Sequence, residues 1–164
     1  MSSEPPASGA SASRVAAPGT VYTIGFTRKS AAAFFGALRR AGIRQLLDVR
    51  LHNAAQLAGF TKRDDLAYFL HALCRARYRH ELLLAPTAEL LTAYRRRAIP
   101  WSEYERRFLA LLAERRVEAR LPRELFAEPT VLLCSEPTAA RCHRRLVAEY
   151  LQQAWGGLTI VHLE

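Results

Sequence analysis

The sequence predicts a three-layer α/β protein, in which a mostly parallel sheet of about five strands carries helices on both faces. Short apolar runs alternate with longer segments whose apolar residues recur every three or four positions, the periods of buried strands and amphipathic helices. Half of the 164 residues are hydrophobic, which is enough for one substantial core. Because helices separate the strands, the connections are expected to be right-handed crossovers that build a parallel sheet.

Five segments have the pattern of strands. The clearest is 131–134, a continuous apolar run of the kind that a parallel sheet buries. In another, Tyr78, His80 and Leu82 alternate with charged residues, which is the period of a strand. In chain order, the expected strands are 21–26, 44–49, 78–82, 131–134 and 158–163.

The helices between these strands are predicted from the residues that cap them. A Ser or Thr at the N-cap accepts a hydrogen bond from an unpaired backbone N–H, and an acidic residue three positions later completes a capping box. The first helix is expected from Ser30 to about Arg40, and the last from Thr138 to about Trp155. Between them, the expected caps are Thr61 with Asp64, Thr87, and Ser102 with Glu105.

Residues 1–20 differ from the rest of the chain. They are rich in Pro, Ser, Ala and Gly and have no apolar periodicity, so we expect a disordered tail before one domain at 21–164. The tail lacks the apolar segment of a secretory signal, and no later run is long enough to span a bilayer. We therefore expect a soluble, cytoplasmic protein with no membrane partner and with reduced cysteines.

The formal net charge of +9 suggests a polyanionic partner. Lys29 and Lys62 are the only lysines, so arginine supplies nearly all of the positive charge. The runs 95–97, 106–107 and 115–116 fall late in helical segments, where cations complement the helix dipole and stay solvated. An arginine-rich surface that binds nucleic acid and an ordinary solvated surface both fit this pattern.

Residues 134–144 hold the greatest concentration of reactive side chains. Two thiols, a carboxylate, an imidazole and two guanidinium groups lie at and after the end of the strand expected at 131–134. Open α/β folds bind ligands at the C-terminal edge of the sheet, and a helix N-terminus there attracts anions and lowers the pKa of a thiol. The candidates from this segment are Cys134, Glu136, Cys142 and His143 for catalysis and Arg144 for binding an anionic substrate.

Two other strand ends would reach the same edge of a parallel sheet. Asp48 and Arg50 end the second expected strand, and the long connection 51–60 has the character of a lid or specificity loop. The first expected strand ends near Thr27 and Arg28, and His80 lies in the third. We therefore add Asp48 as a catalytic candidate. The added substrate-binding candidates are Thr27, Arg28, Arg50, Asn53, Gln56 and His80.

Each candidate also fits a structural role. A free cysteine is most often a small buried residue, which suits Cys134 at a strand end. Cys142 and His143 fall on the apolar stripe of the expected last helix, where packing would explain them. Asp48 and Arg50 would form an ion pair at the edge of the sheet.

The motifs in chain order are Thr23-Ile24-Gly25-Phe26-Thr27, Asp48-Val49-Arg50, Tyr78 with His80, Cys134-x-Glu136 and Cys142-His143-Arg144. Together they resemble the bacterial family catalogued as domain of unknown function 488, over about residues 21–164. The last two motifs at this spacing are the specific ones. Many relatives follow Asp-Val-Arg with a Pro and a Ser-Arg element, which residues 51–62 replace here. The resemblance implies an α/β fold and a site at these motifs, without a reaction.

Three functions are open from the sequence. The favoured one is an enzyme that acts on a nucleotide, a nucleic acid or a phosphorylated metabolite through the Cys, Glu, His and Arg cluster, with an unknown cofactor and no metal ligand assigned. The second is a zinc protein using Cys134, Cys142 and His143, with Glu136 or Asp48 as a fourth ligand. The usual C-x2-4-C spacing is absent, and adjacent helical residues point about 100° apart. The third is an arginine-rich nucleic-acid-binding module without catalysis.

Overall fold

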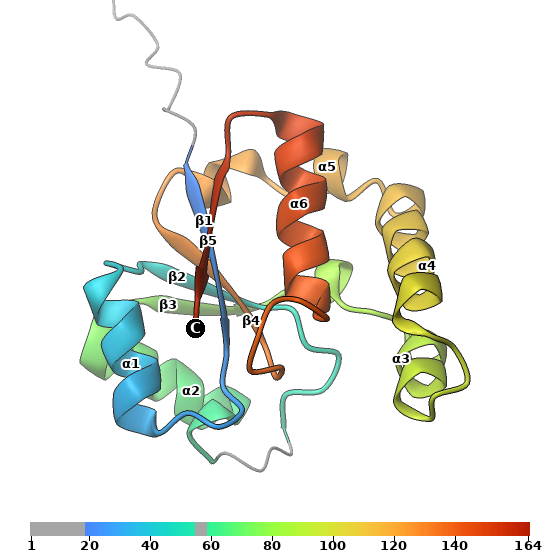
Figure 1. The fold of residues 1–164 in the computed structure, drawn as a ribbon. Coiled ribbons are helices and arrows are strands. Elements are labelled where there is room, and N and C mark those ends of the chain that lie inside the picture. Colours follow the sequence, from blue (N-terminus) through green and yellow to red (C-terminus); the bar gives the residue numbers. More distant parts are fainter. Residues whose placement is uncertain (1–18, 55–58) are drawn as a thin grey trace, which may run out of the picture.

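A computed structural model describes residues 19–54 and 59–164; the substrate-binding candidate Gln56 lies outside the described residues. Within these residues, the chain forms one sheet of five strands in the order β3-β2-β4-β1-β5 (Figure 1). The strands are β1 (Thr20–Gly25), β2 (Gln45–Asp48), β3 (Arg77–His80), β4 (Thr130–Cys134) and β5 (Thr159–Leu163). All four pairings between them are parallel, so the predicted α/β class and the number of strands are confirmed.

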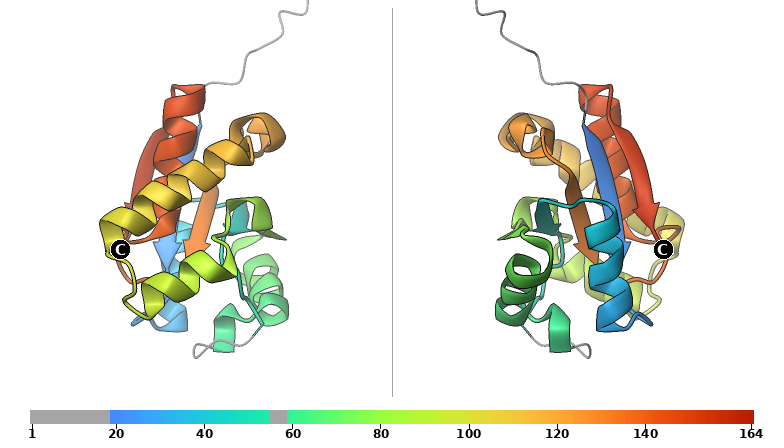
Figure 2. Two further views of the ribbon diagram at one scale, coloured as in Figure 1. Left: turned by 90° about the vertical axis from the view of Figure 1, so that its right-hand side faces the viewer. Right: turned by 90° about the vertical axis from the view of Figure 1, so that its left-hand side faces the viewer.

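Helices cover both faces of this sheet (Figures 1 and 2). In chain order they are α1 (Ala31–Arg40), α2 (Arg63–Phe69), α3 (Ala88–Arg95), α4 (Trp101–Glu114), α5 (Val117–Arg120) and α6 (His143–Trp155). Apolar residues of α1 and α2 form one core with the sheet, and those of α3 to α6 form a second. The connection after β2 therefore crosses one face and the connection after β4 crosses the other, the arrangement that opens a crevice at strand C-termini.

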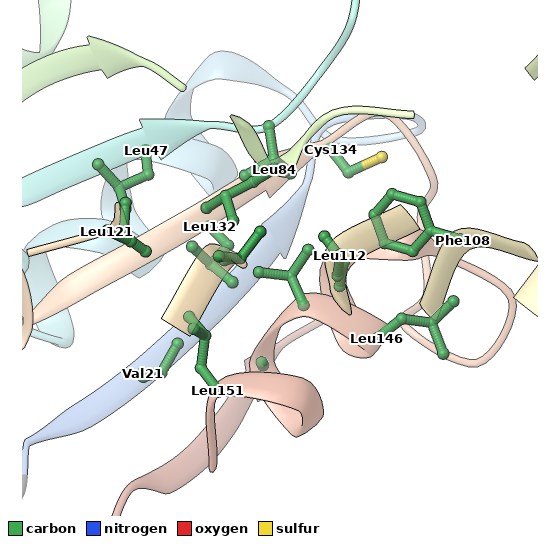
Figure 3. Close-up of a cluster of buried hydrophobic side chains, with 14 of the residues drawn as sticks. Val21, Leu47, Leu84, Phe108, Leu112, Leu121, Leu132, Cys134, Leu146 and Leu151 are labelled. Atoms are coloured by element: carbon green, nitrogen blue, oxygen red, sulfur yellow. The ribbon is translucent and has the colours of Figure 1, made fainter. Parts of the chain in front are cut away.

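Side chains alternate along β4, so its two faces enter different cores. Val131 and Leu133 pack with α1 and α2, whereas Leu132 and Cys134 pack with α4 and α6 (Figure 3). All five residues of β4 are buried, as a central parallel strand requires. Cys134 thus lies at the C-terminal end of β4, on the side of the sheet that α3, α4 and α6 cover.

Two of the five predicted helix caps are confirmed and three are wrong. The hydroxyls of Ser30 and Thr87 each accept the backbone N–H three residues on, at 3.1 and 3.2 Å. Thr61 does not cap α2; it is buried in a 3-10 turn, and Lys62 takes the cap position. Ser102 lies inside the first turn of α4, because that helix starts directly after a proline whose fixed backbone suits a helix start.

The last helix begins later than predicted. Thr138 is not its N-cap; α6 starts at His143, with Cys142 at the cap position in extended conformation. Residues 135–142 form an irregular loop instead, because side chains from elsewhere in the fold hold its backbone. Arg144 donates to the Glu136 carbonyl at 2.6 Å, and Glu164 accepts the Ala139 N–H at 3.0 Å.

The third strand ends earlier than predicted. Leu82 is not in the third strand but begins a 3-10 turn at Leu82–Leu84. Within residues 19–54 and 59–164, no helix combines the length and apolar character needed to cross a membrane.

The two serines offered as caps give a direct test of the helix starts. Replacing Ser30 by Ala is expected to lower the free energy of unfolding by about 1 kcal/mol, since one N-terminal N–H of α1 loses its partner. Replacing Ser102 by Ala is expected to change it by less than about 0.5 kcal/mol, since this exposed hydroxyl caps no helix. Urea unfolding measures both, and equal losses would contradict the observed start of α4.

Candidate active site

A pocket of about 380 Å³ opens at the C-terminal ends of β2 and β4. Its inner end is formed by two thiols and an imidazole, and its walls carry guanidinium groups and aromatic rings. The residues of the inner end are Cys134, Cys142 and His143. Those of the walls include Arg50, Arg95, Arg141, Glu136, Tyr94, Trp101 and Tyr104. A cationic, aromatic cavity with nucleophiles at its base is a natural binding site for an anionic substrate.

The imidazole of His143 is held by hydrogen bonds at both ring nitrogens. Nε2 lies 2.8 Å from the carbonyl oxygen of Val49, and Nδ1 lies 3.4 Å from the sulfur of Cys134. Because a carbonyl oxygen only accepts hydrogen bonds, Nε2 carries a proton. In the neutral ring, Nδ1 therefore presents a lone pair to the Cys134 thiol and can take its proton.

The three groups at the base of the pocket shift one another's pKa. A hydrogen bond from the Cys142 thiol and the adjacent imidazolium of His143 hold the pKa of Cys134 well below its usual value, although burial opposes this. Burial, together with the hydrogen bond donated to Cys134, raises the pKa of Cys142. Burial alone would lower the pKa of His143, but the Cys134 thiolate beside it raises that pKa overall. The site favours a Cys134 thiolate beside a His143 imidazolium.

The position of Cys142 before the helix brings the three ligand-type atoms together. Its φ of −137° and ψ of 139° are those of an extended residue, whereas His143 is the first residue of α6. Adjacent residues within a helix, as the sequence predicts for Cys142 and His143, would point about 100° apart. In the structure, one ligand atom each from Cys134, Cys142 and His143 lies within 4.8 Å of the others.

Arg50 reaches the pocket from a buried network at the end of β2. Its Nε and Nη2 donate to the two carboxylate oxygens of Asp48 at 2.8 and 2.7 Å, and Nη2 also donates to the Thr61 carbonyl. The phenol of Tyr78 donates to the same carboxylate at 2.6 Å. Burial and this hydrogen bond raise the pKa of Tyr78. Asp48 is thus occupied in holding Arg50, and it does not line the pocket.

The other polar candidates near β2 support the loop that follows it. The Asn53 side-chain amide donates to the Tyr78 phenol at 2.8 Å, and His80 Nε2 lies 2.7 Å from the Arg50 carbonyl. None of these three side chains lines the pocket. These contacts position the backbone around Arg50, and the role of Asn53 and His80 in substrate binding stays a prediction.

Thr27 and Arg28 lie at the C-terminal end of β1, outside the pocket. Both side chains are exposed, and the Thr27 N–H donates to the Ser135 carbonyl at 3.1 Å. This bond ties the end of β1 to the loop after β4. The two residues share the sheet edge with the thiols, as parallel pairing predicts, without reaching them.

Arg144 braces the loop that carries Glu136. Its side chain is fully buried and donates to the Glu136 carbonyl and, at 3.3 Å, to the Thr23 hydroxyl. The same carbonyl passes so close to Gly25 that a Cβ there would lie 1.6 Å from its oxygen. Only glycine allows this approach. Arg144 does not line the pocket, and its role in substrate binding stays a prediction.

Several pocket residues were missed at the sequence level. The motifs do not indicate a site role for Tyr94, Trp101 or Tyr104. Arg95 belongs to a run that fits a solvated surface, and Arg141 lies inside the motif segment without being one of the candidates. The spacing Trp101-x-x-Tyr104 puts both rings on one face of a helix, and this was the available signal. Their approach to the thiols depends on how α4 packs against α6.

The fold and the pocket define a class: a parallel α/β protein with a thiol, imidazole and arginine site at the C-terminal edge of its sheet. The family model described as "Domain of unknown function DUF488" matches residues 30–151, and the chain therefore belongs to this family. The matched segment includes Asp48, Arg50 and the 134–144 motif, whereas the motif at 23–27 and β5 lie outside it. Comparison with curated proteins and with solved structures gave no match.

Proposed function

We propose that the protein is an enzyme in which the Cys134 thiolate attacks an anionic substrate held in the pocket. One observation carries the proposal: Cys134 lines the pocket with its sulfur 3.4 Å from His143, whose other nitrogen is fixed by a carbonyl oxygen. A thiol beside an imidazole that a third group orients is the arrangement that activates a cysteine nucleophile.

The walls of the pocket supply the remaining roles. Arg50, Arg95 and Arg141 would bind the anionic group of the substrate through charge-assisted hydrogen bonds. Partial burial and the nearby Cys134 thiolate raise the pKa of Glu136, which favours its protonated form. Glu136 would then act as the general acid that protonates the leaving group as the sulfur–substrate bond forms.

Two alkylating reagents that differ in charge test this proposal. Iodoacetate carries a carboxylate and iodoacetamide does not, so the guanidinium groups of the pocket should attract iodoacetate. The ratio of the iodoacetate rate to the iodoacetamide rate should therefore be higher at Cys134 than for free cysteine. We expect the ratio of the two rates to rise by about fivefold or more, since about 1 kcal/mol of charge attraction changes a rate by this factor.

The substitution Arg141→Gln should reduce that ratio, whereas Arg39→Gln, on α1 across the sheet, should leave it unchanged. Mass spectrometry of the Cys134 peptide gives both rates. A ratio equal to that of free cysteine would reject an anion-binding pocket at this thiol.

A second candidate function is a zinc enzyme. The clustering of Cys134, Cys142 and His143 within 4.8 Å favours it, because two thiolates and an imidazole are a known catalytic zinc set with an open fourth position. The Nε2 contact to the Val49 carbonyl is also the outer hydrogen bond that zinc-binding histidines make. Asp48 is a poor fourth ligand because Arg50 and Tyr78 engage its carboxylate.

Metal content separates the two candidates. If the thiolate acts alone, protein purified without chelators is expected to hold well under one zinc ion per chain, and Cys134 is expected to alkylate fully. Elemental analysis measures the zinc. One zinc per chain, lost in Cys134→Ser and in His143→Gln but kept in Cys74→Ser, would establish a zinc site in place of a free thiolate.

A further inference from the structure

We propose that the pocket is the inner end of a longer groove that binds a single-stranded nucleic acid, with one nucleotide beside Cys134 and its neighbours along the surface between α3 and α4. The inference rests on the proposed function only in placing the reacting group at Cys134. The binding of the strand is argued from the groove itself.

A second hollow continues the pocket outward. Its volume is about 960 Å³, and it lies over the segment that joins α3 to α4. Tyr94, Arg95, Trp101 and Arg141 line both hollows, so the two are contiguous at these side chains. A cavity for one small ligand has about 300–1,000 Å³. The two hollows together suit a ligand longer than a single nucleotide.

The charge along this groove is mainly positive, with Glu136 as the carboxylate among its lining residues. Arg95, Arg97 and Arg141 are exposed, and none of them forms an ion pair within the described part of the chain. On the outer side of α4, by contrast, Arg106 and Arg107 both pair with Glu103. The guanidinium groups of the groove are therefore the ones available to phosphates spaced along a strand.

Aromatic rings stand between these arginines. Trp101 stacks on Tyr104 with ring centroids 5.3 Å apart and an angle of 25°, and the ring of Tyr94 meets Trp101 edge-on at 5.6 Å. These contacts fix the half-buried Trp101 where the two hollows join. Aromatic rings interleaved with cations are the pattern of single-strand binding, in which bases stack on rings and the backbone follows the charge.

A single strand fits this site better than a duplex. The thiol is 3% exposed at the base of the inner pocket, so a base or sugar must leave the stack to reach it. Extrusion from a duplex costs unpairing and unstacking that a single strand avoids. We therefore expect unpaired oligonucleotides to bind more tightly than duplexes of the same sequence.

Fluorescence anisotropy with the Cys134→Ser variant tests binding apart from chemistry. The probes are a labelled single-stranded oligonucleotide of about eight residues, as RNA and as DNA, its duplex, and a mononucleotide. The single strand should bind at least about tenfold more tightly than the mononucleotide and weaken with salt. Trp101→Ala should weaken its binding by about tenfold through the lost stacking.

Matched charge variants locate the strand. Arg97→Gln with Arg141→Gln should weaken oligonucleotide binding, and Arg97→Gln alone should spare the mononucleotide, since Arg97 lines only the outer hollow. The control pair Arg39→Gln with Arg40→Gln removes the same charge from α1, on the opposite face, and should have little effect beyond general screening. Circular dichroism confirms folding of each variant.

The outcomes distinguish this inference from the proposed function. Two results would contradict the groove and leave the proposed thiol chemistry untouched. One is an equal loss of oligonucleotide affinity in the two double variants, and the other is a mononucleotide that binds as tightly as the strand. Tight, Trp101-dependent strand binding by a protein whose Cys134 proves unreactive would support the groove and reject the nucleophile.

Discussion

Replacing His143 by Gln is expected to slow alkylation of Cys134 at neutral pH by about tenfold or more. In the native protein the Cys142 hydrogen bond and the His143 imidazolium lower the pKa of Cys134, so its alkylation should titrate below the free-thiol value of about 8.5. Without the imidazolium, the pKa of Cys134 rises. At a pH below that pKa, each unit of increase reduces the fraction of Cys134 that is thiolate about tenfold. Iodoacetamide rates against pH, read by peptide mapping, measure the change.

Cys74 provides the internal control for this experiment. Burial raises the pKa of this half-buried thiol, and it lies on the α1 and α2 side of the sheet, away from His143. Alkylation of Cys74 should be slow in the native protein and equally slow in His143→Gln. If Cys134 titrates at or above the free-thiol value in the native protein, and His143→Gln leaves that value in place, the imidazole does not activate the thiol.

Replacing Asp48 by Ala is expected to lower the free energy of unfolding by about 3–5 kcal/mol. The carboxylate is fully buried and accepts two hydrogen bonds from the Arg50 side chain and one from Tyr78. Its removal leaves the guanidinium of Arg50, which is only 4% exposed, without a counter-charge. Chemical denaturation of the native protein and the variant measures the loss.

Two further variants serve as controls for the stability loss expected in Asp48→Ala. Asp64→Ala removes the partner of Arg63 at the surface and should cost about 1 kcal/mol or less, because water screens this pair. The apolar double variant Asp48→Leu with Arg50→Met should recover most of the stability lost in Asp48→Ala, since it leaves no unpaired charge. A small loss for Asp48→Ala would mean that Arg50 finds water or another acceptor, and that Asp48 has a role other than holding it.

The substitutions of His143 and Asp48 test two different kinds of contribution to one site. His143 contacts the Cys134 thiol, whereas Asp48 acts through Arg50, which places a guanidinium on the pocket wall.

The sequence was sufficient to predict the sheet and the edge at which the motif residues meet. Apolar runs separated by amphipathic segments require parallel strands, and parallel strands bring their C-terminal ends to one edge. Register then pairs Asp48 with Leu133, one residue before Cys134, so the motifs after β2 and β4 meet. Local signals also sufficed where a side chain caps its own helix, as Ser30 and Thr87 do.

Tertiary structure decided which side chains face the pocket. Thr138 is as good an N-cap as Ser30 by its sequence, but long-range bonds from Arg144 and Glu164 keep residues 136–139 out of α6. The helix consequently starts at His143, and the extended Cys142 before it turns its thiol toward Cys134.

Periodicity and short motifs are local properties of the chain, and they sufficed to predict the fold class, the family and the edge of the sheet that holds the reactive groups. The contacts of each group depend on the folded chain. Asp48 pairs with Arg50, Arg144 supports a loop, and Trp101 forms part of the pocket wall. Burial and hydrogen-bond partners come from segments far apart in the sequence, so local patterns carry no information about them.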